Sequence, residues 1–310
     1  MYSRLCRHYR EHTVQYMSLS NTFNYYKNVD ELRKRYYVAA INKDTLLTLI
    51  SESEVAEQVY NSNAIENSTL TLEDTEKILL QIDLDRYISE REIFEAKNLA
   101  RVVGYIEEKA KIRPLTLDGI RLLHQMLIAN IRDDIAGRFR QQHEYVRVGS
   151  YIAPSPTEIV GQLEQMLAKY HAESSENIIR RIARVHLTFE HIHPFVDGNG
   201  RIGRAINNYL LIREGFVPIN IKFIDKESYY RAFKEFDSKG ATGIMEEIVG
   251  KALTNSYHKR LAYLEGKKII KLADYARENK FSHSNLLNKA NRQTIEAFLE
   301  KGVWKIGVED

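Results

Sequence analysis

The sequence is poor in the residues that cross-link chains or interrupt helices. It has one cysteine, Cys6, and 5 prolines among 310 residues. A single cysteine excludes an internal disulfide and a cysteine-based zinc site, so we expect a reducing, cytoplasmic location. So few prolines favour long uninterrupted helices, and 15 glycines with 5 prolines exclude collagen-like and proline-rich architectures.

Long apolar segments are also missing. No run approaches the roughly 18 apolar residues that a membrane-spanning helix needs, so we expect no membrane partner. The first residues carry Arg4, Arg7 and Arg10 without an apolar stretch, which argues against a signal peptide. We expect residues 1–30 to form a flexible tail, with either Met1 or Met17 as the true start.

Neither sign of charge dominates the chain. There are 45 Lys and Arg residues against 42 Asp and Glu residues, a net charge of +3. This balance argues against nucleic acid as the main ligand but leaves a local basic patch open. Hydrophobic residues make up 44% of the chain, enough for a sizeable core. The length allows roughly two domains of ~150 residues.

Apolar spacing predicts a mostly α-helical fold. Thr71 followed by Asp74 predicts a helix N-cap. Only residues 137–156 read as β structure, a hairpin with its turn at Gly149 and Ser150. Helical patterns occupy residues 30–61, 71–82, 90–110, 116–127, 159–170, 178–189, 201–212, 226–236 and 243–265, and residues 267–310 predict two or three short helices.

The segment 193–204 combines residue types that suit phosphate chemistry. Gly198 and Gly200 flank an asparagine just before a predicted helix. Such a loop exposes backbone N–H groups at the helix N-terminus, where the helix dipole favours an anion. Arg201 and Arg204 lie three residues apart and share a helix face. Two guanidinium groups beside this N-terminus suit a polyphosphate better than a single phosphate.

Two further residues of this segment suit metal binding and proton transfer. Asp197 offers a carboxylate, and Mg²⁺ is usually bound through one or two carboxylates plus phosphates. His193 suits a general base near neutral pH. Each residue alone is more often structural, but together they favour a catalytic site. A zinc site at His186, His191 and His193 is not expected, because their spacing does not match and the arginines would repel the cation.

Residues 193–204 match the Fic-domain motif, His-x-Phe-x-Asp/Glu-Gly-Asn-Gly-Arg-x-x-Arg, at every defined position. The resemblance covers most of residues 55–240. It implies a Fic-type helical bundle with a catalytic core at 111–256, preceded by a helical region at 31–110. Fic proteins usually transfer AMP from ATP to a Ser, Thr or Tyr hydroxyl of a protein. The resemblance implies that His193 deprotonates that hydroxyl, that Asp197 binds Mg²⁺ or Mn²⁺, and that the ATP phosphates are held by Gly198, Asn199, Gly200, Arg201 and Arg204.

The predicted hairpin resembles the flap of Fic proteins, which covers the nucleotide and pairs with an extended target segment by β-strand addition. A plain surface hairpin is the alternative. Paired tyrosines on a helix are more often half-buried packing. The resemblance places the following residues near ATP: Val146, Arg147, Val148 and Gly149 of the flap, and Tyr229, Tyr230 and Asp237 near the adenine, where Asp237 stands in place of an expected Asn.

Ser62, Glu66 and Asn67 resemble the inhibitory motif of Fic proteins, Ser/Thr-x-x-x-Glu-Gly/Asn, in a helix at about 55–67. Ser62 and Glu66 are four residues apart and share a helix face. The resemblance implies that Glu66 pairs with Arg204 at the γ-phosphate position, so that ATP binds with a misplaced α-phosphate. The alternative is a surface ion pair worth ~0–1 kcal/mol. Hydroxyls near this motif, including that of Ser62, are candidate sites of self-modification.

Residues 267–310 read as a short helix, a polar turn and a second helix, similar to a helix-turn-helix, and they are locally basic. A docking or dimer contact is at least as well supported as DNA binding for this module, because the sequence shows no base-reading face. We expect an auto-inhibited protein adenylyltransferase that uses ATP, modifies itself and forms an oligomer. Two other functions stay open: a de-AMPylating phosphodiesterase or other Fic-type phosphate-moiety transferase, and a nucleotide-sensing DNA-binding regulator.

Overall fold

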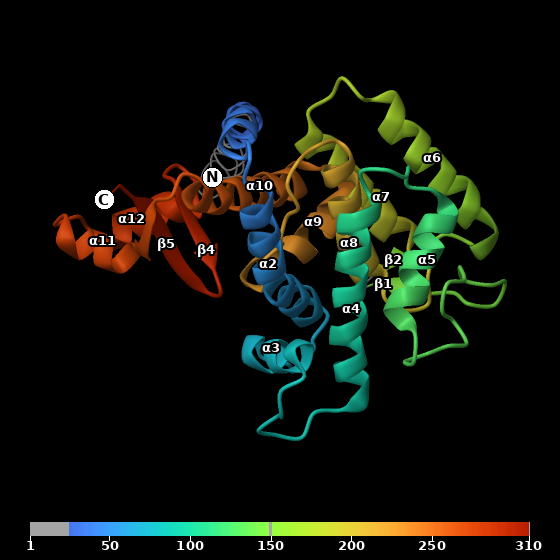
Figure 1. Cartoon of the computed structure of the whole chain (residues 1–310). Coiled ribbons are helices and arrows are strands. Elements are labelled where there is room, and N and C mark those ends of the chain that lie inside the picture. The colour runs from blue at the N-terminus through green and yellow to red at the C-terminus, as the bar shows by residue number, and fades with distance from the viewer. Residues whose placement is uncertain (1–24, 149–150, 310) are drawn as a thin grey trace, which may run out of the picture.

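The structure is a computed structural model that describes residues 25–148 and 151–309, and it is mostly helical, as predicted (Figure 1). Residues 25–39 form the first described helix. It is followed by α2 (Asp44–Ile65), α3 (Leu72–Leu80), α4 (Glu90–Lys109), α5 (Leu117–Ile128), α6 (Ile159–Ala172), α7 (Ile178–Ile192), α8 (Asn199–Arg213), α9 (Lys226–Lys239), α10 (Gly243–Leu264), α11 (Leu272–Glu278) and α12 (His283–Asn291). The 3₁₀ helices η1 (Pro156–Glu158) and η2 (Phe223–Asp225) precede α6 and α9.

Side-chain caps explain where several helices begin. Thr71 is the N-cap of α3 and forms a capping box with Asp74, as the sequence predicts. Ser89, Thr116 and Ser282 cap α4, α5 and α12 by accepting a hydrogen bond from a backbone N–H in the first turn. These caps explain why most helices begin close to the positions predicted from spacing.

One hydrophobic cluster joins the helix at residues 25–39 to helices α2 to α10. Tyr25 and Val29, which are 5% and 0% exposed, belong to it. Residues 25–30 are therefore not part of a flexible tail, and that prediction was wrong for them. Residues 1–24, with Cys6 and Met17, lie outside the described part of the chain.

Helix α8 runs through the middle of this cluster, with α4, α5 and α7 packed around it (Figure 1). Ile202, Ile206 and Leu210 of α8 are fully buried. The C-terminal end of α2 also contacts α8. This arrangement brings a segment from residues 44–65 beside the loop that links α7 to α8.

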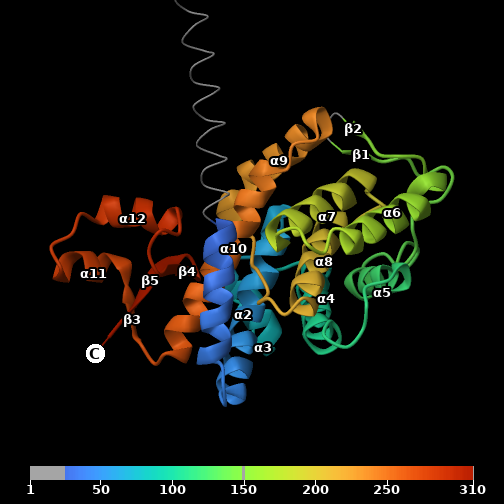
Figure 2. The same ribbon diagram turned by 90° about the horizontal axis from the view of Figure 1, so that it is seen from above.

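The predicted hairpin is present as β1 (Arg147–Val148) and β2 (Tyr151–Ile152), paired antiparallel with Val148 opposite Tyr151. Val146 extends the pairing, because its carbonyl accepts a hydrogen bond from Ala153 N–H at 3.1 Å. The hairpin lies beside the C-terminal end of α9 in Figure 2. Its turn, Gly149 and Ser150, lies outside the described residues.

The C-terminal unit contains more β structure than predicted. It holds β3 (Lys268–Lys271), β4 (Ala297–Glu300) and β5 (Val303–Val308), which form an antiparallel sheet in the order β3-β5-β4. The expectation of helices alone was therefore wrong here. The turn between β4 and β5 is Lys301-Gly302, and both residues have positive φ, as a two-residue hairpin turn requires. Across residues 25–148 and 151–309, no helix is long and apolar enough to cross a membrane.

Candidate active site

His193 closes the C-terminal end of α7 in a left-handed conformation, with φ 48° and ψ 60°. Its Nδ1 lies 3.3 Å from the Glu190 carbonyl oxygen. A carbonyl can only accept, so Nδ1 carries the hydrogen and Nε2 keeps its free lone pair. Burial lowers the pKa of His193 to about 4. The imidazole is therefore neutral at pH 7 and is able to take up a proton.

The loop after His193 is held by buried polar side chains. Asn199 accepts a hydrogen bond from Phe195 N–H and donates one to the Phe195 carbonyl, both at 2.9 Å. Because the Asn199 side chain is buried and occupied in this way, only its backbone remains for the predicted phosphate cradle. Arg140 donates to the carbonyls of His193 at 2.8 Å and Pro154 at 2.9 Å. It thereby ties the loop to the residues that follow the hairpin.

His124 of α5 supports the same loop from the other side. Its Nδ1 accepts a hydrogen bond from Gly137 N–H at 3.0 Å, so its Nε2–H donates to the Asp197 carbonyl, also at 3.0 Å. The ring stacks on Phe195 with 3.7 Å between ring centres. Burial lowers the pKa of His124 to about 4, which keeps this donor–acceptor pattern fixed at neutral pH.

Two glycines of the motif lie where a side chain would collide with neighbouring atoms. Gly198 has a φ of 81°, and a Cβ there would lie 3.1 Å from a methyl carbon of Leu127. A Cβ on Gly200 would lie 2.1 Å from Glu66 Oε1. The bare backbone therefore lets Glu66 approach the N-terminus of α8. This end of the helix carries free N–H groups that favour an anion.

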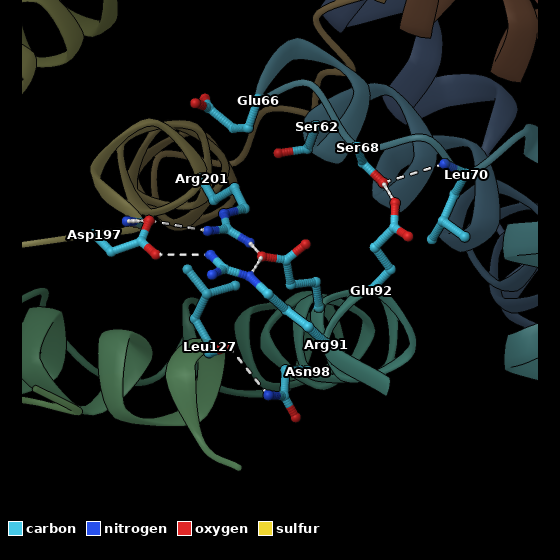
Figure 3. A network of polar contacts seen from close by, with 12 residues as sticks. Ser62, Glu66, Ser68, Leu70, Arg91, Glu92, Asn98, Leu127, Asp197 and Arg201 are labelled. Atoms are coloured by element: carbon cyan, nitrogen blue, oxygen red, sulfur yellow. Dashed lines mark hydrogen bonds and ion pairs between the residues drawn. The ribbon is translucent and has the colours of Figure 1, made fainter. Parts of the chain in front are cut away.

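Asp197 and Arg201 form a charged cluster with two residues of α4 (Figure 3). Arg201 Nη2 lies 3.4 Å from Asp197 Oδ1, and Arg91 Nη2 lies 3.1 Å from Asp197 Oδ2. Glu95 Oε1 lies 3.2 Å from Arg201 Nη1 and 3.2 Å from Arg91 Nε. Glu95 thus holds both arginines against Asp197, and Arg201 is 4% exposed. The sequence analysis missed Arg91 and Glu95, although their four-residue spacing is visible.

Asp197 fits Mg²⁺ as a hard oxygen ligand, and it is a third exposed at the mouth of the loop. Among the described residues, no group of three or more His, Cys, Asp or Glu side chains is arranged to hold a metal ion. A single carboxylate matches an ion that takes its remaining ligands from phosphates and water. The site therefore suits a metal that arrives with a nucleotide.

Arg204 is buried, and each of its three nitrogens has a partner. Nε donates to Ser62 Oγ at 2.9 Å, and Nη2 donates to the Ser62 carbonyl at 2.8 Å and to Glu66 Oε1 at 2.9 Å. Nη1 donates to Tyr229 Oη at 3.0 Å. The pair between Glu66 and Arg204 is the contact that the sequence predicts. The end of α2 therefore occupies the guanidinium group that the motif would offer to a phosphate.

Helix α9 holds the end of α2 in place. Tyr230 Oη donates to the Ile65 carbonyl at 3.1 Å, and Lys226 Nζ donates to Asn67 Oδ1 at 2.7 Å. Asn67 has a φ of 67°, a conformation that Asn adopts more readily than most residues. The predicted residues Asn67 and Tyr230 thus meet at the point where Glu66 is presented.

Tyr229 of α9 lies buried beside Arg204. It is 1% exposed, and its hydroxyl lies between Arg204 and His186 Nε2, which is 2.7 Å away. Burial raises the pKa of Glu190 to about 8, with the Glu66 carboxylate as a further cause. Glu190 is therefore largely neutral at pH 7 and adds no full charge beside Arg204. Tyr229 acts here as a support for Arg204.

The Asp237 carboxylate also has a partner within the protein. Its Oδ1 lies 2.8 Å from His191 Nδ1, and His191 Nε2 lies 2.7 Å from Tyr151 Oη. This chain of contacts links α9 and α7 to strand β2 of the hairpin. The structure thus brings Asp237 to the hairpin through His191, while Arg147 of β1 is exposed.

Comparison with known proteins agrees with this geometry. The family model described as Fic/DOC family matches residues 114–211. These residues form a Fic domain. A protein named protein adenylyltransferase Fic from Nematostella vectensis is 28% identical over 209 residues, which are 65% of this chain and 48% of that protein. One of the same name from Drosophila willistoni is 27% identical over 72% of this chain and 46% of its own. The chain spans about half the length of these relatives.

Solved structures show the same fold beyond the Fic domain. A Fic domain containing signaling protein from Bacteroides thetaiotaomicron has a TM-score of 0.69 at 24% identity, over 78% of this chain and 98% of its own. Fic-1 from C. elegans has a TM-score of 0.69 at 24% identity, over 81% and 75% of the two chains. A Fic family protein from Desulfovibrio desulfuricans has a TM-score of 0.66 at 20% identity, over 94% and 96%. The likeness therefore extends from the Fic domain into the neighbouring helices.

Proposed function

We propose that this chain is an auto-inhibited protein adenylyltransferase with its catalytic core at residues 111–256. The observation that carries the proposal is a neutral His193 next to a helix N-terminus that is flanked by two buried arginines, Arg201 and Arg204. The names of the relatives support the same activity. A base, an anion-binding backbone and two cations are what transfer of a nucleotidyl group from a polyphosphate requires.

The proposed reaction uses the free lone pair of His193. Nε2 takes the proton of a target hydroxyl, and the hydroxyl oxygen forms a bond to the α-phosphorus of ATP. The bond from that phosphorus to the bridging oxygen of the β-phosphate breaks, and pyrophosphate leaves with the bonding electrons. Arg201 and Arg204 offset the negative charge on the phosphates, and the N–H groups at the start of α8 hold them in place. A general base typically contributes on the order of 10²- to 10⁴-fold to such a rate.

Asp197 would hold Mg²⁺ or Mn²⁺ together with the nucleotide. When bound, the ion would neutralise phosphate charge and favour departure of the leaving group. Asp197 is now paired with Arg91 and Arg201. Nucleotide binding would therefore require at least Arg201 to exchange this partner for a phosphate.

The contacts of Arg204 support the proposed auto-inhibition. A γ-phosphate that needs Arg204 must compete with Glu66, which the α9 residues Tyr230 and Lys226 hold in place through the end of α2. ATP that binds without this contact would lack part of its alignment, and alignment contributes strongly to catalysis. We therefore assign Ser62, Glu66 and Asn67 to an inhibitory segment.

The hairpin is the proposed binding surface for the protein target. Its short strands offer backbone groups for pairing with an extended chain, and Arg147 is exposed on β1. Modification of the chain by itself requires no other partner and gives the simplest readout. The single cysteine supports a cytoplasmic location.

The test is the intact mass of the purified chain after incubation with ATP and Mg²⁺. We compare the wild type, Glu66→Gly and the double variant Glu66→Gly/His193→Ala. The proposal predicts added mass of ~329 Da per AMP group, more of it in Glu66→Gly than in the wild type and none in the double variant.

Other outcomes would assign another reaction. An added mass that differs from AMP would indicate transfer of a different phosphate moiety. If no form gains mass, alone or with cell lysate, the transferase proposal is wrong. Loss of AMP from a modified protein in the presence of the wild type would then favour a de-AMPylating phosphodiesterase.

A further inference from the structure

The C-terminal unit, residues 268–308, has the form of a helix-turn-helix backed by a β-hairpin. It lies away from helices α5, α6 and α7 (Figure 2). Helices α11 and α12 pack on a small core of Leu272, Ala290 and Ala297. Strands β3, β5 and β4 close the other side of that core. In a helix-turn-helix the second helix is the one that enters the DNA major groove. Here that helix is α12.

The outer face of α12 carries side chains that suit base edges. Leu286 and Ala290 pack in the small core, so the opposite face carries Ser284 and Asn288, and Arg292 follows at the C-cap of the helix. All three are exposed. Asn pairs well with adenine and Arg with guanine in the major groove, and Ser pairs with several bases. The face therefore has the composition of a base-reading surface.

The charge of the segment around α12 also favours DNA as the partner. Residues 279–295 contain no Asp or Glu. In the same stretch Lys280, Lys289 and Arg292 are exposed. The diameter of a helix with its side chains, about 10–12 Å, fits the ~12 Å width of the major groove. A segment that carries basic and no acidic side chains is complementary in charge to a DNA duplex.

The hairpin β4–β5 anchors the unit instead of sharing in this face. Lys301 N–H donates to Glu57 Oε1 of α2 at 3.0 Å, and Lys301 Nζ lies 2.7 Å from Glu76 of α3. Glu300 is 2.6 Å from Lys259 of α10. These contacts hold the unit on the catalytic body and leave the outer face of α12 uncovered by the described chain.

We infer that the outer face of α12 binds double-stranded DNA. This function lies beyond the proposed AMP transfer and does not depend on it. Double-stranded RNA is not the expected partner, because its major groove is too narrow for a helix. One helix without a second anchoring arm predicts modest affinity that depends strongly on salt.

The test is the fluorescence anisotropy of a labelled 20-base-pair duplex titrated with the full chain at 50 to 200 mM salt. Saturating ATP is present so that the phosphate site does not capture the DNA. The variant Lys289→Ala/Arg292→Ala is compared with Lys97→Ala/Arg101→Ala, which removes one exposed Lys and one exposed Arg from α4. The first variant should weaken binding at least tenfold and lower the log–log salt slope by about 2, while the second should match the wild type.

Base reading is tested separately with Asn288→Ala. From a pool of random duplexes, the wild type should enrich a short sequence, and this variant should bind with a relaxed preference at one position. The inference is wrong if the full chain does not bind duplex DNA at 50 mM salt. It is also wrong if the α4 variant loses as much affinity as the α12 variant, or if duplex RNA binds as tightly as duplex DNA. Thermal melting confirms that each variant is folded.

Discussion

Replacing Glu66 tests how much of the proposed restraint on AMP transfer comes from one ion pair. Glu66 Oε1 accepts one hydrogen bond from Arg204 Nη2 at 2.9 Å, and the carboxylate is a third exposed. A hydrogen bond to a charged group contributes ~1.5–3 kcal/mol, and the partial exposure places this one at the lower end. About 1.4 kcal/mol corresponds to a tenfold change. Glu66→Gly should therefore raise the rate of self-modification about tenfold at low ATP concentration.

Two further variants separate the charge from the rest of the contact. Glu66→Gln keeps the shape of the side chain but removes its charge. It should therefore raise the rate of self-modification less than Glu66→Gly does. Ser62→Ala removes only the bond from Arg204 Nε, because the Ser62 carbonyl still accepts from Nη2. Because the bond from Nη2 to the Ser62 carbonyl is retained, loss of the Nε bond should raise the labelling rate only ~2- to 5-fold.

The assay is the initial rate of labelling with a fluorescent ATP analogue, measured below its KM. Glu164→Gln on the exposed face of α6 is the matched control and should leave the rate unchanged. The reasoning is refuted if Glu66→Gly remains folded and labels within twofold of the wild type. A larger effect of Ser62→Ala than of Glu66→Gly would also refute it, because the carboxylate would then not be the main competitor for Arg204.

Three smaller predictions concern pH and the anchoring of α2. The pKa of His124 is lowered from 6.5 to about 4, which gives about 3 kcal/mol of stability that is complete above pH 6.5 and lost as pH falls towards 4. Calorimetry should show a steep fall in Tm over that range, and a shallower one for His124→Asn. The pKa of Glu190 is raised from 4.5 to about 8, so its contribution is complete below pH 4.5 and lost as pH rises through 8. Glu190→Gln should therefore melt above the wild type at pH 9 but not at pH 5. Tyr230→Phe removes one hydrogen bond to the Ile65 carbonyl, and labelling should rise ~2- to 5-fold.

The helices were predictable because their signals are local. Apolar spacing and caps such as Thr71 with Asp74 act within a few residues, and they placed most helices. The strands of the C-terminal unit were not predictable in the same way. A strand such as Lys268–Lys271 has only two partly buried residues, and its β structure depends on pairing with Val308 to Lys305 across the unit. Such pairing is not visible in a short window of sequence.

Site residues could be predicted where they lie in one contiguous motif. They could not be predicted where folding brings residues together that are far apart in the sequence. His193, Asp197 and the arginines of α8 lie within one segment, so their spacing alone indicated phosphate chemistry. Arg140 and His124 are far from that segment in sequence, and their contacts to its backbone carbonyls depend on how α5 and the hairpin pack. The contact between the Tyr229 hydroxyl and Arg204 is a further example, because it joins α9 to α8 across 25 residues of sequence.

The middle of helix α2 and its C-terminal end have different tasks, and they should respond differently to mutation. Near the middle, Glu57 is 5% exposed and accepts hydrogen bonds from Lys222 Nζ at 2.6 Å and Lys301 N–H at 3.0 Å. Glu57→Ala leaves the Lys222 ammonium, on a side chain that is 12% exposed, without this carboxylate, which costs about 3 kcal/mol, the lower end of the range for a buried pair. At roughly 2–4 °C per kcal/mol for a chain somewhat smaller than this one, Tm should fall by about 6 °C or more.

At the C-terminal end of α2, Glu66 is more exposed, and Arg204 keeps its bonds to Ser62 and Tyr229 when Glu66 is lost. Glu66→Gly should therefore change the labelling rate strongly and Tm by only a few degrees, while Glu57→Ala should do the opposite. Glu57→Gln/Lys222→Met removes both charges and should recover much of the lost Tm. If Glu57→Ala left Tm unchanged, the buried pair would not be what fixes α2. Release of Glu66 would then not be limited to the last turn of α2, because the pair would no longer hold the rest of the helix in place.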